Sequence, residues 1–375
     1  MGFIAIGDLH LDVRGFRPEI PGEDCVVALE EIARVALSRG LPLVLLGDVF
    51  DKNRPSPWVV GEAKRILETI PEVWFIQGNH DKNRERAWLT IVDTCRHLTL
   101  KPQEVGGHRL VGIDYAPMEE FGENLGRIDK RVDGIVCHQA LKQGLGFDGA
   151  WNSDLDTFDS GKANNVWIGD LHAPMELFNA NRTVRAVYSG SMWPRNILEA
   201  KHKPRILVVG DAADENGFYG YSEHFLPARH VLSLDIDSEE TLEQVRADEE
   251  DLFSRLKVDD GNTDPRIANP VLHVKYFSDI PGVEDTFRGL LDRIGGGYYV
   301  ETVLPSRKSF AAETRTAVSL GKEAVTFTSL LSDRLSEHGQ VRDMALSLAA
   351  AKSSEDVRGI IGFWRNKILK KENEK

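Results

Sequence analysis

The feature that most constrains this chain is a repeated pattern in which a short apolar run is followed at once by a small polar cluster. Continuous apolar runs with polar boundaries are typical of strands buried on both faces of a sheet. Longer amphipathic segments separate the runs, and the spacing predicts helices over 24–38 and 56–69. Alternating strands and helices predict an α/β layered domain. The runs lie at 3–6, 43–46, 73–76, 134–137, 166–168 and 206–209.

Five of these runs lead into polar clusters of one chemical kind. The loops at the carboxyl ends of strands in an α/β sheet form one rim, where ligands bind. We therefore expect the clusters to converge in space, although 30 to 60 residues separate most of them. They read Gly7-Asp8-Leu9-His10, Gly47-Asp48-Val49-Phe50-Asp51, Gly78-Asn79-His80-Asp81, His138-Gln139 and Gly169-Asp170-Leu171-His172.

Carboxylates, imidazoles and an amide oxygen without any thiolate form a ligand set suited to Mn, Fe, Mg or Zn. The seven or eight groups exceed what one ion needs. Two ions bridged by a shared carboxylate would use them all, and such pairs, about 3.5–4 Å apart, serve in-line attack on phosphate esters. The glycines would let each loop bend sharply and bring its backbone close to a phosphate.

Each cluster alone has a structural alternative, because an Asp at a strand end is often a helix cap or a turn former. The five together, in this order and each after a buried strand, are far more specific than any one of them.

These clusters resemble the calcineurin-like metallophosphoesterase superfamily, with its Asp-x-His, Gly-Asp-x-x-Asp, Gly-Asn-His-Asp, strand-end His and Gly-x-x-His. Within it the chain is most similar to SbcD-type nuclease subunits, the bacterial and phage relatives of the DNA double-strand-break-repair nuclease. Pro55-Ser56 after the second cluster and Tyr188-Ser189-Gly190-Ser191 after the last carry the closer likeness. The resemblance is specific to about residue 210 and only architectural beyond.

The resemblance implies roles for the clustered side chains. His80 would donate a proton to the leaving oxygen or stabilise the phosphate, with Asp51 or Asp81 supporting a histidine. The cofactors would be two divalent ions, Mn²⁺ first and Mg²⁺ as the alternative. The first ion would be held by Asp8, His10, Asp48 and His172, and the second by Asp48, Asn79, His138 and Asp170, with Asp48 as the bridge.

Asp170 departs from the family pattern, which usually has His-x-His in this motif. An Asp keeps an oxygen ligand and adds a negative charge, which would favour Mn or Mg over softer ions. We expect replacement of the ligand here rather than its loss, and the choice of metal stays open.

The pattern of predicted strands and helices changes near residue 228. We expect a metallophosphoesterase nuclease domain at 1–227, a small α+β unit at 228–305 and a helical region at 306–375. In the second unit the pattern predicts strands at 231–234, 271–276 and 298–302, a helix at 283–294, and an acidic helix opened by Asp237.

The resemblance also implies partners. The unit at 228–305 would be a capping domain that reads DNA, and the subunits would form a homodimer. The helical tail would dock on an SbcC-type coiled-coil ATPase. Its last segment, capped near Ser353, places Val357, Ile360, Ile361, Trp364 and Ile368 on one face, which could equally pack on its own domain.

A formal charge of −13 argues against a generic nucleic-acid binder. However, residues 235–264 hold twelve carboxylates and three basic side chains, so the acidity is concentrated there. We expect this stretch to face away from substrate, and DNA affinity to depend on the bound ions.

The three cysteines are far apart and form no disulfide framework. The first residues have neither the basic region nor the apolar run of a signal peptide, and no later apolar span approaches about 20 residues, so we expect neither export nor a membrane span. We therefore expect a protein of the cytoplasm, in a bacterial or phage-infected cell, with no membrane partner.

Other candidates have structural interpretations. Trp193 could stack on a base or pack in the core, and Arg84 and Arg86 could meet a phosphate backbone or be solvated. The histidines without a cluster partner are expected to be structural: His97, His108, His202, His224, His230, His273 and His338.

The leading hypothesis is a two-metal-dependent DNA exonuclease/endonuclease, the nuclease subunit of an SbcCD-like repair and recombination complex. The alternative is a stand-alone phosphoesterase acting on small phosphodiesters or phosphoproteins. A third hypothesis, a non-catalytic module with a vestigial site, is disfavoured by the intact ligand set.

Overall fold

The computed structural model describes residues 2–11, 22–81, 88–145, 151–159, 161–256, 264–304 and 306. The predictions for Arg84, Arg86, His338 and the helical region after residue 306 lie outside these described residues.

The first sheet has six strands in the order β12-β11-β1-β2-β3-β4. Strands β1 to β4 run parallel, and β11 and β12 add an antiparallel hairpin beside β1. The bounds are β1 (Phe3–Ile6), β2 (Leu43–Leu45), β3 (Val73–Phe75), β4 (Cys95–His97), β11 (Arg205–Ala213) and β12 (Tyr219–Phe225).

The second sheet also has six strands, in the order β5-β6-β7-β8-β10-β9. Its four central strands are parallel and its two edge strands antiparallel. The bounds are β5 (Gln103–Val105), β6 (His108–Ile113), β7 (Gly134–His138), β8 (Asn165–Gly169), β9 (Met175–Phe178) and β10 (Arg185–Tyr188).

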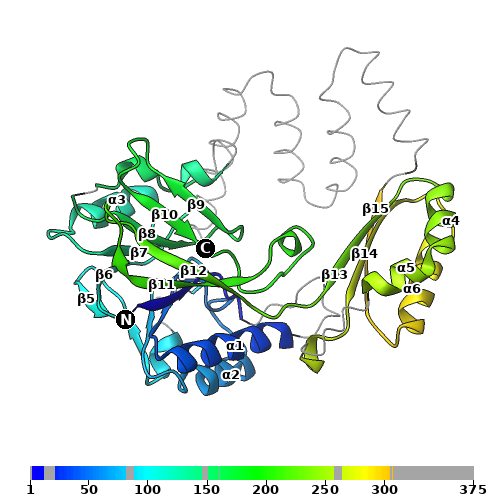
Figure 1. Ribbon diagram of the computed structural model, residues 1–375, viewed down its shortest axis with the longest axis horizontal. Helices are drawn as coiled ribbons and strands as arrows, with labels where there is room; N and C mark the ends of the chain where they lie inside the picture. The colour runs from blue at the N-terminus through cyan, green and yellow to red at the C-terminus, as the bar shows by residue number, and fades with distance from the viewer. Residues whose placement is uncertain are drawn as a thin grey trace, which may run out of the picture.

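The two sheets pack face to face, with helices on their outer sides (Figure 1). Helices α1 (Glu23–Arg39) and α2 (Pro57–Leu67) cover the first sheet, and α3 (Met118–Gly126) covers the second. Ile4 and Ile6 of β1 pack under the helices, whereas Phe3 and Ala5 pack between the sheets. Both strand faces are therefore buried, which explains the continuous apolar runs and confirms the predicted layered α/β fold.

The two predicted helices are confirmed to within two residues at each end. Helix α1 has acidic residues in its first turn and ends at Gly40 with a left-handed φ of 61°. Helix α2 begins after Ser56 with a proline at its first position, where the missing N–H costs nothing. No helix within the described residues is long and apolar enough to cross a bilayer. Five short 3₁₀ turns connect other elements: η1 (Trp88–Ile91), η2 (Lys142–Gly144), η3 (Leu155–Thr157), η4 (Glu199–Lys201) and η5 (Pro265–Ile267).

A third, all-parallel sheet lies beside the sandwich, in the order β13-β14-β15. Its helices cover the face turned away from the other two sheets (Figure 1). On the facing side, Ile197 and Ala200, from the segment between β10 and β11, pack against Val271. The bounds are β13 (Val231–Ile236), β14 (Val271–Phe277), β15 (Tyr298–Leu304), α4 (Glu239–Ala247), α5 (Glu249–Leu256) and α6 (Val283–Arg293).

The predicted start of the acidic helix is wrong by one residue. Ser238, not Asp237, is the N-cap, because its hydroxyl accepts the backbone N–H of Thr241. Asp237 instead accepts the Thr241 hydroxyl. The acidic segment also breaks at Asp248 into two short helices.

A buried ion pair ties the third sheet to α1. Arg229 donates from Nε to Asp24 Oδ2 at 3.0 Å and from Nη2 to Asp24 Oδ1 at 2.6 Å, and the two side chains are 0% and 3% exposed. Nη1 and Nη2 also donate to the carbonyl oxygens of Asn269 and Arg266, and the Cζ atom lies 4.9 Å from the ring centre of Tyr298. Such two-pronged pairing fixes orientation as well as distance.

Replacement of Asp24 by Ala would leave the Arg229 charge buried and unpaired. We expect a loss of about 3–5 kcal/mol in the free energy of unfolding, measured by urea denaturation. Glu30→Gln removes the partly exposed pair with Arg266 and should cost less than about 1 kcal/mol. Equal losses in the two variants would contradict a special role for the buried pair.

Candidate metal centre

All seven predicted ligands lie at the carboxyl ends of strands, on the rim where the two sheets of the sandwich meet. Asp8 and His10 follow β1, Asp48 follows β2 and Asn79 follows β3. From the second sheet, His138 ends β7, and Asp170 and His172 follow β8. The predicted convergence is therefore confirmed for every one of them.

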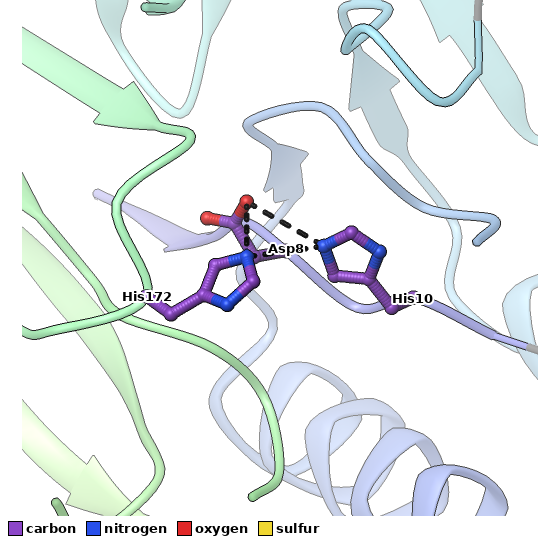
Figure 2. Close-up of side chains that lie close together, drawn as sticks. All are labelled: Asp8, His10 and His172. Carbon is purple, nitrogen blue, oxygen red and sulfur yellow. Dashed lines mark hydrogen bonds and ion pairs between the residues drawn. The ribbon is translucent and has the colours of Figure 1, made fainter. Parts of the chain in front are cut away.

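Asp8, His10 and His172 form one donor group (Figure 2). The Asp8 Oδ1 atom lies 3.9 Å from His10 Nε2 and 3.7 Å from His172 Nε2. The two imidazole nitrogens are 3.2 Å apart. Ligands bound to one ion at about 2.0–2.2 Å lie at such mutual separations, so these residues fit the first predicted ion.

His138 lies at the middle of the second donor group. Its Nε2 atom is 3.2 Å from Asn79 Oδ1, 3.5 Å from Asp48 Oδ2 and 3.7 Å from Asp170 Oδ1. The same Asp48 Oδ2 atom lies 3.6 Å from His10 Nε2. Asp48 thus stands between the two groups, where a bridging carboxylate would be needed. Asp170, which replaces the family histidine, is within the cluster.

Three of the four cluster histidines have a hydrogen-bond partner at Nδ1, which leaves Nε2 directed toward the carboxylates. A hydrogen bond from Nδ1–H keeps the lone pair on Nε2, the form that binds a metal. The Nδ1 partners are the Leu46 carbonyl for His138 (2.8 Å), Glu199 Oε1 for His172 (2.9 Å) and the Asp51 carbonyl for His80 (2.6 Å). His10 Nδ1 lies 3.3 Å from Asp51 Oδ1 without forming a hydrogen bond.

Of the two residues predicted to support a histidine, Asp51 takes that position and Asp81 does not. The buried Asp81 carboxylate accepts the backbone N–H groups of Val49, Phe50 and Gly78 instead. It therefore joins the loop after β2 to the loop after β3. Burial and the nearby Asp48 charge raise the pKa of Asp81 to about 6, against the effect of these hydrogen bonds.

The backbone is strained at four of the predicted ligands. Asp8, His10, Asp48 and Asp170 have φ angles of 54°, 41°, 49° and 98°. Arg182 is the one other non-glycine residue with positive φ in the described part of the chain. L-residues rarely adopt this region, and such strain gathers at functional sites. Here it points the side chains of consecutive loops at one volume.

The buried carboxylates of the cluster carry negative charge that bound cations would compensate. Burial raises the pKa of Asp8 to about 6, although His138 and His172 oppose it. Burial lowers the pKa of His138, but Asp48, Asp8 and Asp170 outweigh that effect and raise it to about 10. Buried carboxylates need paired positive charge. Two divalent ions would supply it, so the residues present fit the metals that the sequence predicts.

Two glycines pack directly against predicted ligands. A Cβ atom at Gly47, where φ is 92°, would collide with the ring of His138. A Cβ atom at Gly78 would overlap the carboxylate and backbone of Asp48. The positive φ of Gly47 agrees with the predicted sharp bend. Close packing against the ligands is a further reason for both glycines, and approach of the backbone to a phosphate stays a prediction.

The remaining candidates take structural positions. Trp193 is 1% exposed and donates to the Leu9 carbonyl at 3.0 Å, so packing is the correct alternative. It holds the loop between Asp8 and His10. None of the six described histidines predicted to be structural belongs to the donor groups; His97, for example, pairs with Asp114.

Two residues that contact this centre, Arg195 and Glu199, are not among those predicted from the sequence. Glu199 binds His172 through Oε1 and the backbone N–H of Arg195 through Oε2. Burial raises the pKa of Glu199, but the His172 hydrogen bond and the Arg195 charge outweigh it and bring the pKa to about 2. Both residues lie in an irregular segment without an apolar run, so periodicity could not reveal them.

Residues 1–161 match the calcineurin-like phosphoesterase family. The match ends before Asp170 and His172, which the phosphoesterase fold brings to the same centre.

Among individual proteins, the chain is similar to DNA double-strand break repair protein Mre11 of several archaea. The Archaeoglobus fulgidus protein is 35% identical over 208 residues, which are 46% of each chain. The Sulfurisphaera tokodaii protein is 25% identical over 186 residues, 44% of this chain and 48% of the relative. The Sulfolobus acidocaldarius protein is 21% identical over 307 residues, 75% of this chain and 76% of the relative. The chain therefore spans about half the length of the first two relatives.

Gly78→Ala should displace Asp48 and weaken Mn²⁺ binding at least about 10-fold, the effect typical of disturbing a ligand's support. Titration calorimetry measures the affinity. Gly61→Ala is the matched control, because a Cβ there meets nothing within 4 Å inside α2 and should stabilise the helix by about 0.5–1 kcal/mol. Unchanged Mn²⁺ binding in the Gly78 variant would refute the packing argument.

Glu199→Ala removes the acceptor that orients His172, so we expect about a 10- to 100-fold loss of affinity for one of two Mn²⁺ ions. Glu199→Gln keeps an acceptor without the charge, so its Mn²⁺ affinity should lie between those of Glu199→Ala and the parent. Glu62→Gln, on the outside of α2, serves as the control. A loss of both ions together would show that Glu199 supports the fold rather than one ligand.

Proposed function

We propose that this chain is a two-metal-dependent DNA nuclease, an exonuclease/endonuclease that hydrolyses phosphodiester bonds in DNA repair and recombination. The observation that carries the proposal is the pair of donor groups on either side of Asp48, built on strained backbone at the rim of a phosphoesterase fold. Two-metal centres of this kind are suited to in-line displacement at phosphorus.

Seven side chains would hold the two ions, and one of them would be shared. Asp8, His10, Asp48 and His172 would hold one ion, and Asp48, Asn79, His138 and Asp170 the other. When bound, the ions, with Mn²⁺ favoured by the oxygen-rich donors, supply Lewis acidity at the phosphate.

His80 is placed to act on the leaving group. Its side chain is 40% exposed, its Nδ1 is used by the Asp51 carbonyl, and its Nε2 lies 3.9 Å from Asp48 Oδ2. The backbone N–H of His80 donates to the other Asp48 oxygen at 2.9 Å. The ring is thus held beside the donors. We assign proton donation to the leaving oxygen to the doubly protonated ring, in which Nδ1–H donates to the Asp51 carbonyl and Nε2 carries the second proton.

DNA as the substrate rests on the relatives, which are DNA double-strand break repair proteins. In this proposal residues 228–305 form the capping domain, the subunit is a homodimer, and the region after 305 binds an SbcC-type coiled-coil ATPase. The position of the acidic helices supports a cap of this kind. Helices α4 and α5 lie on the outer face of the third sheet, away from the sandwich (Figure 1).

The second candidate is a stand-alone phosphoesterase for small phosphodiesters or phosphoproteins. It is favoured by the extent of the family match, which covers residues 1–161 and none of the third sheet. Linear duplex DNA, bis(p-nitrophenyl) phosphate and a phosphopeptide, each offered with Mn²⁺, separate the two candidates. Cleavage of the small substrates with intact DNA would favour the second.

With linear DNA and Mn²⁺, Asp48→Asn should abolish cleavage because an amide replaces the carboxylate that both donor groups share and removes its negative charge. His80→Ala should lower the rate about 10²- to 10⁴-fold while Mn²⁺ binding by calorimetry stays close to that of the parent. The control is His97→Ala, whose ring pairs with Asp114 outside the donor groups. Full activity of the Asp48 variant would exclude the proposed centre.

A further inference from the structure

One cation contacts the predicted ligands within the described part of the chain, and the nuclease proposal leaves it without a role. Arg195 Nη2 lies 2.6 Å from His172 Nδ1 and 3.2 Å from His172 Nε2. Arg195 Nη1 lies 3.6 Å from Asp51 Oδ1. The side chain is 18% exposed, so the guanidinium reaches from solvent into the donor cluster.

Glu199 anchors one edge of this guanidinium. Arg195 donates from Nε to Glu199 Oε2 at 3.4 Å and from Nη2 to Glu199 Oε1 at 3.2 Å. Asn196 donates to the same Glu199 Oε1 at 2.8 Å. The carboxylate is thereby fixed from several sides, so the arginine stem and its Nε edge have one position.

The other edge of the guanidinium keeps unused donors. The carboxylate of Asp51 is 3.6 Å from Nη1, beyond hydrogen-bond distance, and Nη1 has no hydrogen-bond acceptor among the described residues. An arginine serving only to position Glu199 would need its Nε edge alone. A guanidinium with unpaired terminal N–H groups beside a metal centre is instead suited to bind the oxygens of a phosphate, whose spacing matches that of the N–H groups.

A change in the protonation of the His172 ring would release a further N–H donor of Arg195. His172 Nδ1 can donate to Glu199 or accept from Arg195, but its single position cannot do both. Use of His172 Nε2 as a ligand puts the proton on Nδ1, which then pairs with Glu199. Arg195 Nη2 loses its acceptor on the ring in that state, so both terminal nitrogens become available to a substrate.

We infer that Arg195 binds the scissile phosphodiester of the substrate, with Nη1 and Nη2 donating to its non-bridging oxygens. This inference rests on the proposed phosphodiesterase function and adds a substrate-binding residue to it. The fixed positive charge would hold the phosphate against the donor cluster and stabilise the additional negative charge that develops on its oxygens during hydrolysis.

The test measures binding and turnover separately. Calorimetry gives the affinity of the full chain, loaded with Mn²⁺, for inorganic phosphate, and bis(p-nitrophenyl) phosphate gives kcat and KM. Arg195→Ala should weaken phosphate binding about 10- to 100-fold and raise KM, with Mn²⁺ affinity within about twofold of the parent. Arg195→Lys keeps the positive charge but has only one nitrogen donor group, so its phosphate affinity should lie between those of the alanine variant and the parent. Arg34→Ala on the exposed face of α1 is the control.

The outcomes are distinct. Unchanged phosphate affinity in Arg195→Ala, or a parallel fall in Mn²⁺ affinity, would show that Arg195 only positions Glu199 and would overturn the inference. Failure of the parent protein to bind phosphate would overturn it too. Arg195-dependent phosphate binding by a parent protein that cleaves no phosphodiester would sustain the arginine site and remove the nuclease proposal. If the alanine variant does not fold, the lysine variant decides by the same measurements.

Discussion

The structure depends on the placing of three carboxylates, Asp8, Asp48 and Asp170, at one sparsely solvated rim. Such charges are costly to bury, and their surroundings are arranged to aim them at a common volume rather than to neutralise them. The loops turn through positive φ, glycines make room, and histidines are tied at Nδ1 so that their other nitrogen faces the same volume. The double-sheet core provides the rigidity that holds this strained arrangement together.

Much of this could be predicted because buried parallel strands leave a strong signature. Each apolar run became a strand, and each polar cluster reached the rim, since the carboxyl ends of parallel strands share one edge. Edge strands such as β4 and β9 left no such signature because they are short and partly exposed. Ser238 and Asp237 are both good caps by composition, and only the course of the backbone decides between them.

Contacts between segments distant in the chain were the part that sequence could not supply. A glycine before an aspartate is visible in the sequence, but the His138 ring that requires Gly47 is ninety positions away. Asp81 looked like a partner for histidine because it follows one, yet it binds backbone amides of another loop. Arg195 and Glu199 contact His172 from a segment with neither periodicity nor motif.

Residues 195–201 make two sets of contacts at once. On one side Arg195 and Glu199 touch His172, and on the other Ile197 and Ala200 pack against Val271 of the third sheet. Surface loops usually tolerate insertions and deletions during evolution. Here a single added residue would put one set of contacts out of phase with the other. Residues 195–201 should therefore hardly vary in length among close relatives, and grafts between homologues should keep this segment with both of its neighbours.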